Sequence, residues 1–151
     1  MTVGEQQGET GRKAKADGAS VLLTNARWLL AGFLVFAGLS HLIYPAPFEA
    51  QVPPWMPAPA AVILVSGLVE IALGVALVAV RSKRPMVGWV VAAFFVIVFP
   101  GNISQFLTHA DAFGLGSDFA RGVRLLFQPL LVVWALWCTG AWSAMLARRR
   151  R

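Results

Sequence analysis

The segment SGLVEIALGVALVAV, residues 66–80, is the most informative part of this chain. It is apolar apart from Ser66 and a single carboxylate, Glu70, near its middle. With the apolar residues that precede it, the segment makes a run of about 20 residues, the length that an α-helix needs to cross a bilayer. Four such runs follow one another along the sequence, which predicts a multi-pass membrane protein.

The composition agrees with a membrane location. Hydrophobic residues make up 58% of the 151 residues, and charged residues make up only 13%. Soluble domains carry roughly 25% charged residues. The mean hydropathy is +0.67, and the length suits a single domain.

Four crossings predict an all-α fold, a four-helix transmembrane bundle over residues 21–146, with helices at about 21–44, 60–80, 86–107 and 121–146. Residues 1–20 are polar and predict a disordered cytoplasmic tail, and residues 147–151 predict a basic cytoplasmic tail. The segment PAPFEAQVPPWMPAPA, residues 45–60, contains six prolines and predicts a short external loop, because proline interrupts helices. A kink is expected at Pro100, and Asp118 is expected to cap the last helix.

The cations predict the orientation of the chain. Eleven of the thirteen Lys and Arg residues lie at ends of the apolar runs that share one side of the membrane, at positions 12–15, 27, 81–84 and 148–151. Such an excess is typical of the cytoplasmic side, so both termini are predicted to be cytoplasmic. We assign the net charge of +6 to contact with anionic lipid headgroups rather than to nucleic acid.

The polar residues of the apolar runs gather at the centre and the outer half of the predicted bundle. At a rise of about 1.5 Å per residue, Glu70 lies near the midplane. His41, Asn102, Arg124 and Gln128 lie toward the outer ends of their helices.

Small residues at spacings of three and four accompany Glu70 on one helix face, namely Ser66, Gly67 and Gly74. Such a stripe allows close helix packing, so we expect Glu70 to face the interior of the bundle.

Two interpretations of Glu70 stay open. An ionised carboxylate without a partner is costly in hydrocarbon, so Glu70 needs a proton or a partner. Arg124 is the candidate cation, with Gln128 and His41 as bridges over about 10 Å along the membrane normal. The cluster either fixes the helix register or forms a site for a ligand or proton, the default for intramembrane ionisable groups. Asn102 either satisfies backbone groups freed by a proline or contacts a ligand.

The remaining reactive residue types offer little chemistry. Cys138 is the only cysteine, so no intramolecular disulfide can form, and we expect it to be a packing residue. With only two histidines, we expect no metal site built from His and Cys. Arg121 is expected at the rim of the bundle, and His109 and Asp111 are expected to be solvated loop residues.

Five stretches of the sequence resemble the DoxX-like family of small bacterial integral membrane proteins. They are GLSHLIYPAPF (38–48), VPPWMP (52–57), SGLVEIALG (66–74), VFPGNI (98–103) and RLLFQPLL (124–131). The resemblance covers about residues 30–138, and the five polar positions named above coincide with recurring polar positions of that family. The family usually has Ala at the position of Gly101 and Pro at that of Leu126.

The resemblance implies a location in the bacterial plasma membrane and a role in membrane oxidoreductase systems, among them thiosulfate:quinone oxidoreductase. We therefore expect an accessory subunit rather than a complete enzyme, with no covalently bound cofactor and no catalytic residue carried over. A membrane quinone would bind among His41, Glu70, Asn102, Arg124 and Gln128, and a redox partner protein would supply the electrons; a homo-oligomer is also considered. A purely architectural membrane protein and a small proton-coupled transporter are the alternatives.

Overall fold

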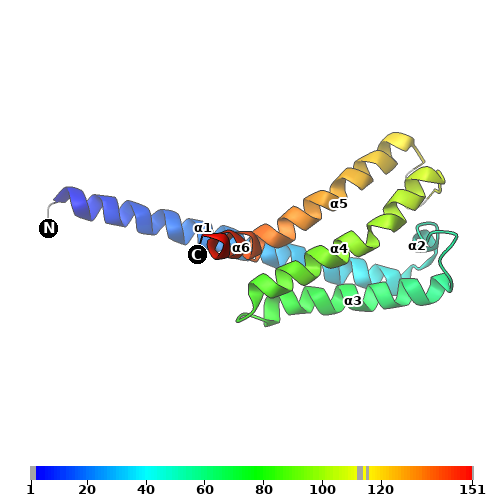
Figure 1. The fold of residues 1–151 in the computed structure, drawn as a ribbon, viewed down its shortest axis with the longest axis horizontal. Coiled ribbons are helices and arrows are strands. Elements are labelled where there is room, and N and C mark those ends of the chain that lie inside the picture. The colour runs from blue at the N-terminus through cyan, green and yellow to red at the C-terminus, as the bar shows by residue number, and fades with distance from the viewer. Residues whose placement is uncertain (1–2, 112–113, 115, 151) are drawn as a thin grey trace.

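The computed structural model describes residues 3–111, 114 and 116–150, and this part of the chain is helical without any strand. The helices are α1 (Val3–Ile43), α2 (Ala46–Glu49), α3 (Pro59–Ala79), α4 (Arg84–Leu107), α5 (Asp118–Cys138) and α6 (Ala141–Arg149) (Figure 1). Four of them are long and apolar enough to cross a membrane, counting residues Gly11–Ile43 of α1. The predicted all-α fold with four spanning helices is confirmed.

The spanning helices associate as two pairs. α1 packs mainly against α3, and α4 packs mainly against α5. The pairs lie close together near the α3–α4 connection and diverge toward the opposite end, where α2 is found (Figure 1). Large apolar side chains such as Phe36, Val96 and Leu126 are exposed outside the cavity lining, as expected of a surface that a bilayer covers.

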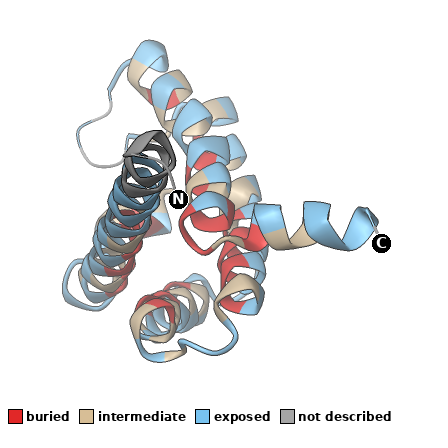
Figure 2. Cartoon of the chain, turned by 90° about the vertical axis from the view of Figure 1, so that its left-hand side faces the viewer, coloured by how far each residue is buried: buried red, intermediate tan, exposed pale blue. Residues whose placement is uncertain are grey.

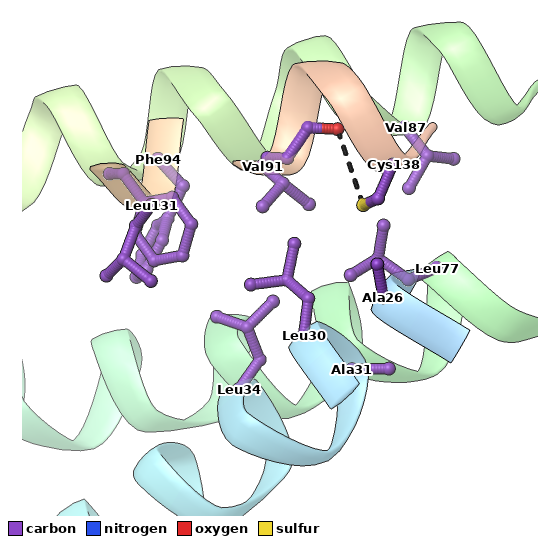
Figure 3. Packing of buried hydrophobic residues seen from close by; sticks show 12 residues of the cluster. Ala26, Leu30, Ala31, Leu34, Leu77, Val87, Val91, Phe94, Leu131 and Cys138 are labelled. Atoms are coloured by element: carbon purple, nitrogen blue, oxygen red, sulfur yellow. Dashed lines mark hydrogen bonds between the residues drawn. The ribbon is translucent and has the colours of Figure 1, made fainter. Parts of the chain in front are cut away.

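The hydrophobic core occupies the closed end of the bundle. Leu30 and Leu34 of α1 are completely buried there against Leu77 of α3 and Val91 of α4 (Figure 3). Cys138 of α5 belongs to the same cluster, with Sγ 3.7 Å from the carbonyl oxygen of residue 135. Its predicted role as a packing residue is confirmed.

The N-terminal segment differs from the prediction. α1 begins at Val3, so residues 3–20 are helical rather than disordered, and residues 11–20 are exposed on a helix that extends beyond the bundle (Figure 1). The polar composition suggested disorder, but Ala, Lys, Glu and Gln in this segment are good helix formers and no proline separates it from the first span.

The last predicted helix is in fact two helices. α5 ends at Cys138, and Gly140 has a left-handed backbone with φ of 71°. Glycine adopts that conformation without steric cost, so the chain can turn there. The following helix α6 leaves the side of the bundle toward the C-terminus (Figure 2). Buried residues of the four long helices face one another in the same view (Figure 2).

The start of α5 also corrects the prediction. Ser117, not Asp118, is the N-cap, and its Oγ accepts a hydrogen bond of 3.2 Å from the backbone N–H of Ala120. Asp118 is the first helical residue, where a carboxylate is favoured by the helix dipole. Pro100 lies inside α4 and Pro129 lies near the middle of α5.

Candidate functional site

A cavity of about 740 Å³ lies where the two helix pairs diverge. Its volume is in the range of small-molecule sites, roughly 300–1,000 Å³. Most of its lining is apolar and includes Phe33, Phe48, Phe95 and Leu131. Its polar lining includes all five residues singled out in the sequence, together with one more: His41, Gln51, Glu70, Asn102, Arg124 and Gln128.

The α1–α3 side of the cavity carries an imidazole and a carboxylate. His41 Nδ1 lies 2.8 Å from the carbonyl oxygen of Ala37 and 3.3 Å from Glu70 Oε2. A carbonyl can only accept, so Nδ1 bears a proton and donates it to Ala37. The contact with Glu70 has the distance of an ion pair but not the geometry of a hydrogen bond, because Oε2 is buried without a hydrogen-bond partner among the described residues.

The neighbourhood of His41 restrains the imidazole ring. The ring stacks on Phe48 of α2, with 3.7 Å between the centroids and 28° between the planes. Phe48 is itself buried, so α2 holds the ring from the loop side. The proline-rich segment therefore contributes directly to the site, although the sequence suggested only a short external loop.

Two glycines bring Glu70 next to His41. A Cβ atom built on Gly38 would lie 2.5 Å from the carbonyl oxygen of Gly67, and one built on Gly67 would lie 2.8 Å from His41 Cβ. Only residues without a side chain allow α1 and α3 to approach this closely. Glu70 is 9% exposed, so the predicted inward direction of its face is confirmed.

The α4–α5 side of the cavity carries a chain of hydrogen bonds. Arg124 donates from Nη2 to Gln51 Oε1 at 2.6 Å and from Nε to Asn102 Oδ1 at 3.3 Å. Asn102 Nδ2 donates to Gln128 Oε1 at 2.7 Å, and Gln128 Nε2 donates to the Phe95 carbonyl at 2.7 Å. These four side chains, from Gln51 to Gln128, are called the amide network below.

The amide network changes two sequence-based interpretations. The sequence suggested Arg124 as the cation for Glu70, whereas Arg124 is held by Gln51 and Asn102 and the carboxylate lies beside His41. Asn102 bonds to side chains of α5, not to backbone groups freed by the proline of α4. Depth along the membrane normal, which the sequence predicts, does not specify which helix faces which.

Gln51 is the functional candidate that the sequence did not reveal. It follows α2 in the proline-rich segment, where a polar residue looks like ordinary loop surface. Its backbone passes close to α4, since a Cβ on Gly101 would lie 3.1 Å from the Gln51 carbonyl oxygen. Only the return of the loop over the cavity makes its side chain a partner of Arg124.

Three other polar residues lie outside the cavity lining. Arg121 is 7% exposed, so the expectation of a rim charge is wrong; its Nη2 lies 3.5 Å from Asp118 Oδ1. His109 is exposed as expected but lies 2.7 Å from the same carboxylate oxygen. Asp111 is exposed. Across the described residues, no three His, Cys, Asp or Glu side chains are grouped closely enough to hold a metal ion.

Comparison with curated proteins and with solved structures gives no match. One family model, described as a domain of unknown function, matches residues 30–139. The matched region includes the C-terminal part of the first spanning helix, all of the other three and every polar residue of the cavity. The chain therefore belongs to the DUF8561 family.

Proposed function

We propose that this membrane protein binds a quinone in the cavity and serves as an accessory subunit of a membrane oxidoreductase system. The observation that carries the proposal is Glu70 Oε2, a buried oxygen that has no hydrogen-bond partner in the described part of the chain and lies in the wall of a largely apolar cavity. A buried polar atom without a partner is costly. A ligand that donates a hydrogen bond to Oε2 would remove that cost.

A quinone headgroup suits the two sides of the cavity. Its ring is flat and apolar and would lie among phenylalanine side chains. Its two oxygens are at opposite ends of the ring. In the reduced form, one hydroxyl would donate to Glu70, and the other oxygen would lie toward the amide network, whose N–H groups can donate after turning from their present acceptors.

Proton transfer gives Glu70 a role in turnover. Reduction of a quinone to a quinol takes up two protons and two electrons. Glu70 would give one proton to the quinone oxygen that it binds and His41 would give the second, while a redox partner protein supplies both electrons. The resemblance to DoxX-like proteins supports this assignment and a location in the bacterial plasma membrane.

The test uses the protein purified in lipid nanodiscs that contain a membrane quinone. Retained quinone is extracted and quantified for the wild type, for Glu70→Gln and for Glu49→Gln. The last variant is the matched control, because Glu49 is exposed on α2 and lies outside the cavity lining. Glu70→Gln keeps an acceptor oxygen but removes its charge, and a hydrogen bond to a charged acceptor is roughly twice as strong as one to a neutral acceptor, so this variant should weaken retention roughly tenfold. Glu49→Gln should retain the wild-type amount.

Other outcomes would reject the proposal. No retained quinone in the wild type, with a Glu70→Gln variant that unfolds at a lower temperature, would make the cluster architectural. Proton-coupled solute flux in liposomes that is lost in Glu70→Gln, again without quinone retention, would make the protein a transporter.

A further inference from the structure

An arginine is buried at the closed end of the bundle, far along α1 from the cavity. Arg27 is 8% exposed, and its Nε has no hydrogen-bond partner in the described part of the chain. The sequence suggested that Arg27 merely precedes the first span, but the structure places it inside α1 beside the hydrophobic core. A buried guanidinium nitrogen without an acceptor calls for a partner.

The neighbours of Arg27 add positive charge instead of compensating it. The charges of Arg84 and Arg81 act on the Arg27 guanidinium. Among the described residues, no salt bridge includes any of these three arginines. Arg27, Arg81 and Arg84, here called the arginine cluster, therefore bring together three cations from α1, the α3–α4 connection and the start of α4, and no carboxylate of the described residues forms a salt bridge with them.

The start of α4 strengthens the attraction for an anion at the same place. Its N-cap, Lys83, makes no side-chain hydrogen bond to the first turn, so no capping side chain occupies the N–H groups there. Pro85 contributes no N–H group, and the donors of this turn are those of its other residues. The N–H groups of a first turn have no partner within the helix, and the helix dipole makes this end positive. Phosphate groups are among the anions that bind at such helix starts.

We propose that the arginine cluster binds the phosphate group of an anionic phospholipid. Guanidinium groups pair with phosphate oxygens through two parallel hydrogen bonds, and one phosphate can engage more than one arginine. The surroundings favour a lipid over a soluble phosphate. Trp28 and Met86 follow the cluster residues closely in sequence and are 56% and 57% exposed, so they offer an apolar surface for acyl chains.

The proposed lipid lies at the end of the bundle opposite to α2 and the cavity (Figure 1). It would therefore occupy the other leaflet from the one nearest the cavity opening. Its headgroup would join α1 to the α3–α4 connection, where the described residues provide no salt bridge of their own.

Lipid retention measured by native mass spectrometry tests the proposal. The full chain is released from nanodiscs that contain equal amounts of phosphatidylglycerol and phosphatidylcholine, and bound lipids are counted. Loss of one charged hydrogen bond changes affinity roughly tenfold or more. We expect the wild type to prefer phosphatidylglycerol by at least about tenfold, and Arg84→Gln to lose most of that preference.

Arg148→Gln is the matched control, because it removes the same charge from the exposed part of α6. It should keep the wild-type preference within about twofold, less than the loss of one charged hydrogen bond. Arg27→Gln should behave as Arg84→Gln does; if it fails to fold, the more exposed Arg84 decides the question. Equal losses in Arg84→Gln and Arg148→Gln, or no preference in the wild type, would overturn the proposal. Displacement of the lipid by inorganic phosphate at low concentration would identify a soluble anion as the ligand and would also overturn it.

Discussion

Replacing Gly38 by alanine should separate α1 from α3 and destabilise the bundle. The added Cβ would lie 2.5 Å from the Gly67 carbonyl oxygen and 2.8 Å from Ile71 Cγ1. The first neighbour is backbone, so it cannot move without its helix. The same methyl group would lie 3.1 Å from Glu70 Cβ, which places the disturbance beside the cavity.

The expected loss of stability follows from the overlap of the added methyl group with the atoms of α3. Ordinary van der Waals contact begins near 3.4 Å, so the two backbones must separate by about 0.9 Å at this point. A gap of about 0.5–1 Å removes a quarter to a half of the attraction of each atom pair along the interface. Overpacking of this kind costs about 1–3 kcal/mol.

The assay is equilibrium unfolding in mixed detergent micelles with increasing SDS, followed by circular dichroism. Gly32→Ala is the matched control on the same helix, because a Cβ at Gly32 has no atom within 4 Å. It should leave the free energy of unfolding unchanged or raise it by up to about 1 kcal/mol through helix propensity. Equal stabilities of Gly38→Ala and Gly32→Ala would refute the close approach of α1 and α3.

Three further substitutions probe other contacts by the same unfolding assay. Gly88→Ala would place a methyl group against Thr139 Oγ1 and should lower the free energy of unfolding by about 1–3 kcal/mol. Adding Thr139→Ala should restore part of that free energy, and a double variant whose effect equals the sum of the two single effects would contradict the contact. Asn102→Ala removes the donor to Gln128 Oε1 and should cost about 1–3 kcal/mol, so unchanged stability would argue against the amide network. Trp134→Phe removes a 3.1 Å hydrogen bond from α5 to an α1 carbonyl and should cost about 0.5–1.5 kcal/mol, whereas a stabilised variant would contradict it.

The spanning helices were predictable because few backbone conformations are stable in the hydrocarbon of a bilayer. Backbone groups in hydrocarbon must be hydrogen-bonded internally, so an apolar run of sufficient length becomes a helix. The segment at 66–79 accordingly lies in α3 and Val80 is its C-cap; the bounds Pro59–Ala79 differ by one residue at each end from the predicted 60–80. Predictions were poorer where this constraint ends, at residues 3–20 and at the turn around Gly140.

The candidate site was predictable in its residues but not in its connections. Polar residues are few in the apolar runs, so Glu70, His41 and Arg124 could be selected as candidates. Their depth along the membrane normal could be predicted from the helical rise. Depth says nothing about rotation of one helix around another. The pairing of Glu70 with His41, and of Arg124 with Gln51, depends on how α1 and α3 meet at their glycines and on how the loop after α2 returns.

The amino-acid sequence is sufficient to predict four helices long and apolar enough to cross a membrane, because helix length and hydropathy depend on local composition and on the fixed geometry of a helix. The cavity, the Glu70 oxygen that has no hydrogen-bond partner among the described residues, and the arginine cluster arise only when helices distant in sequence come together. Their existence depends on packing between helices, where a glycine or a single turn of loop changes which side chains meet.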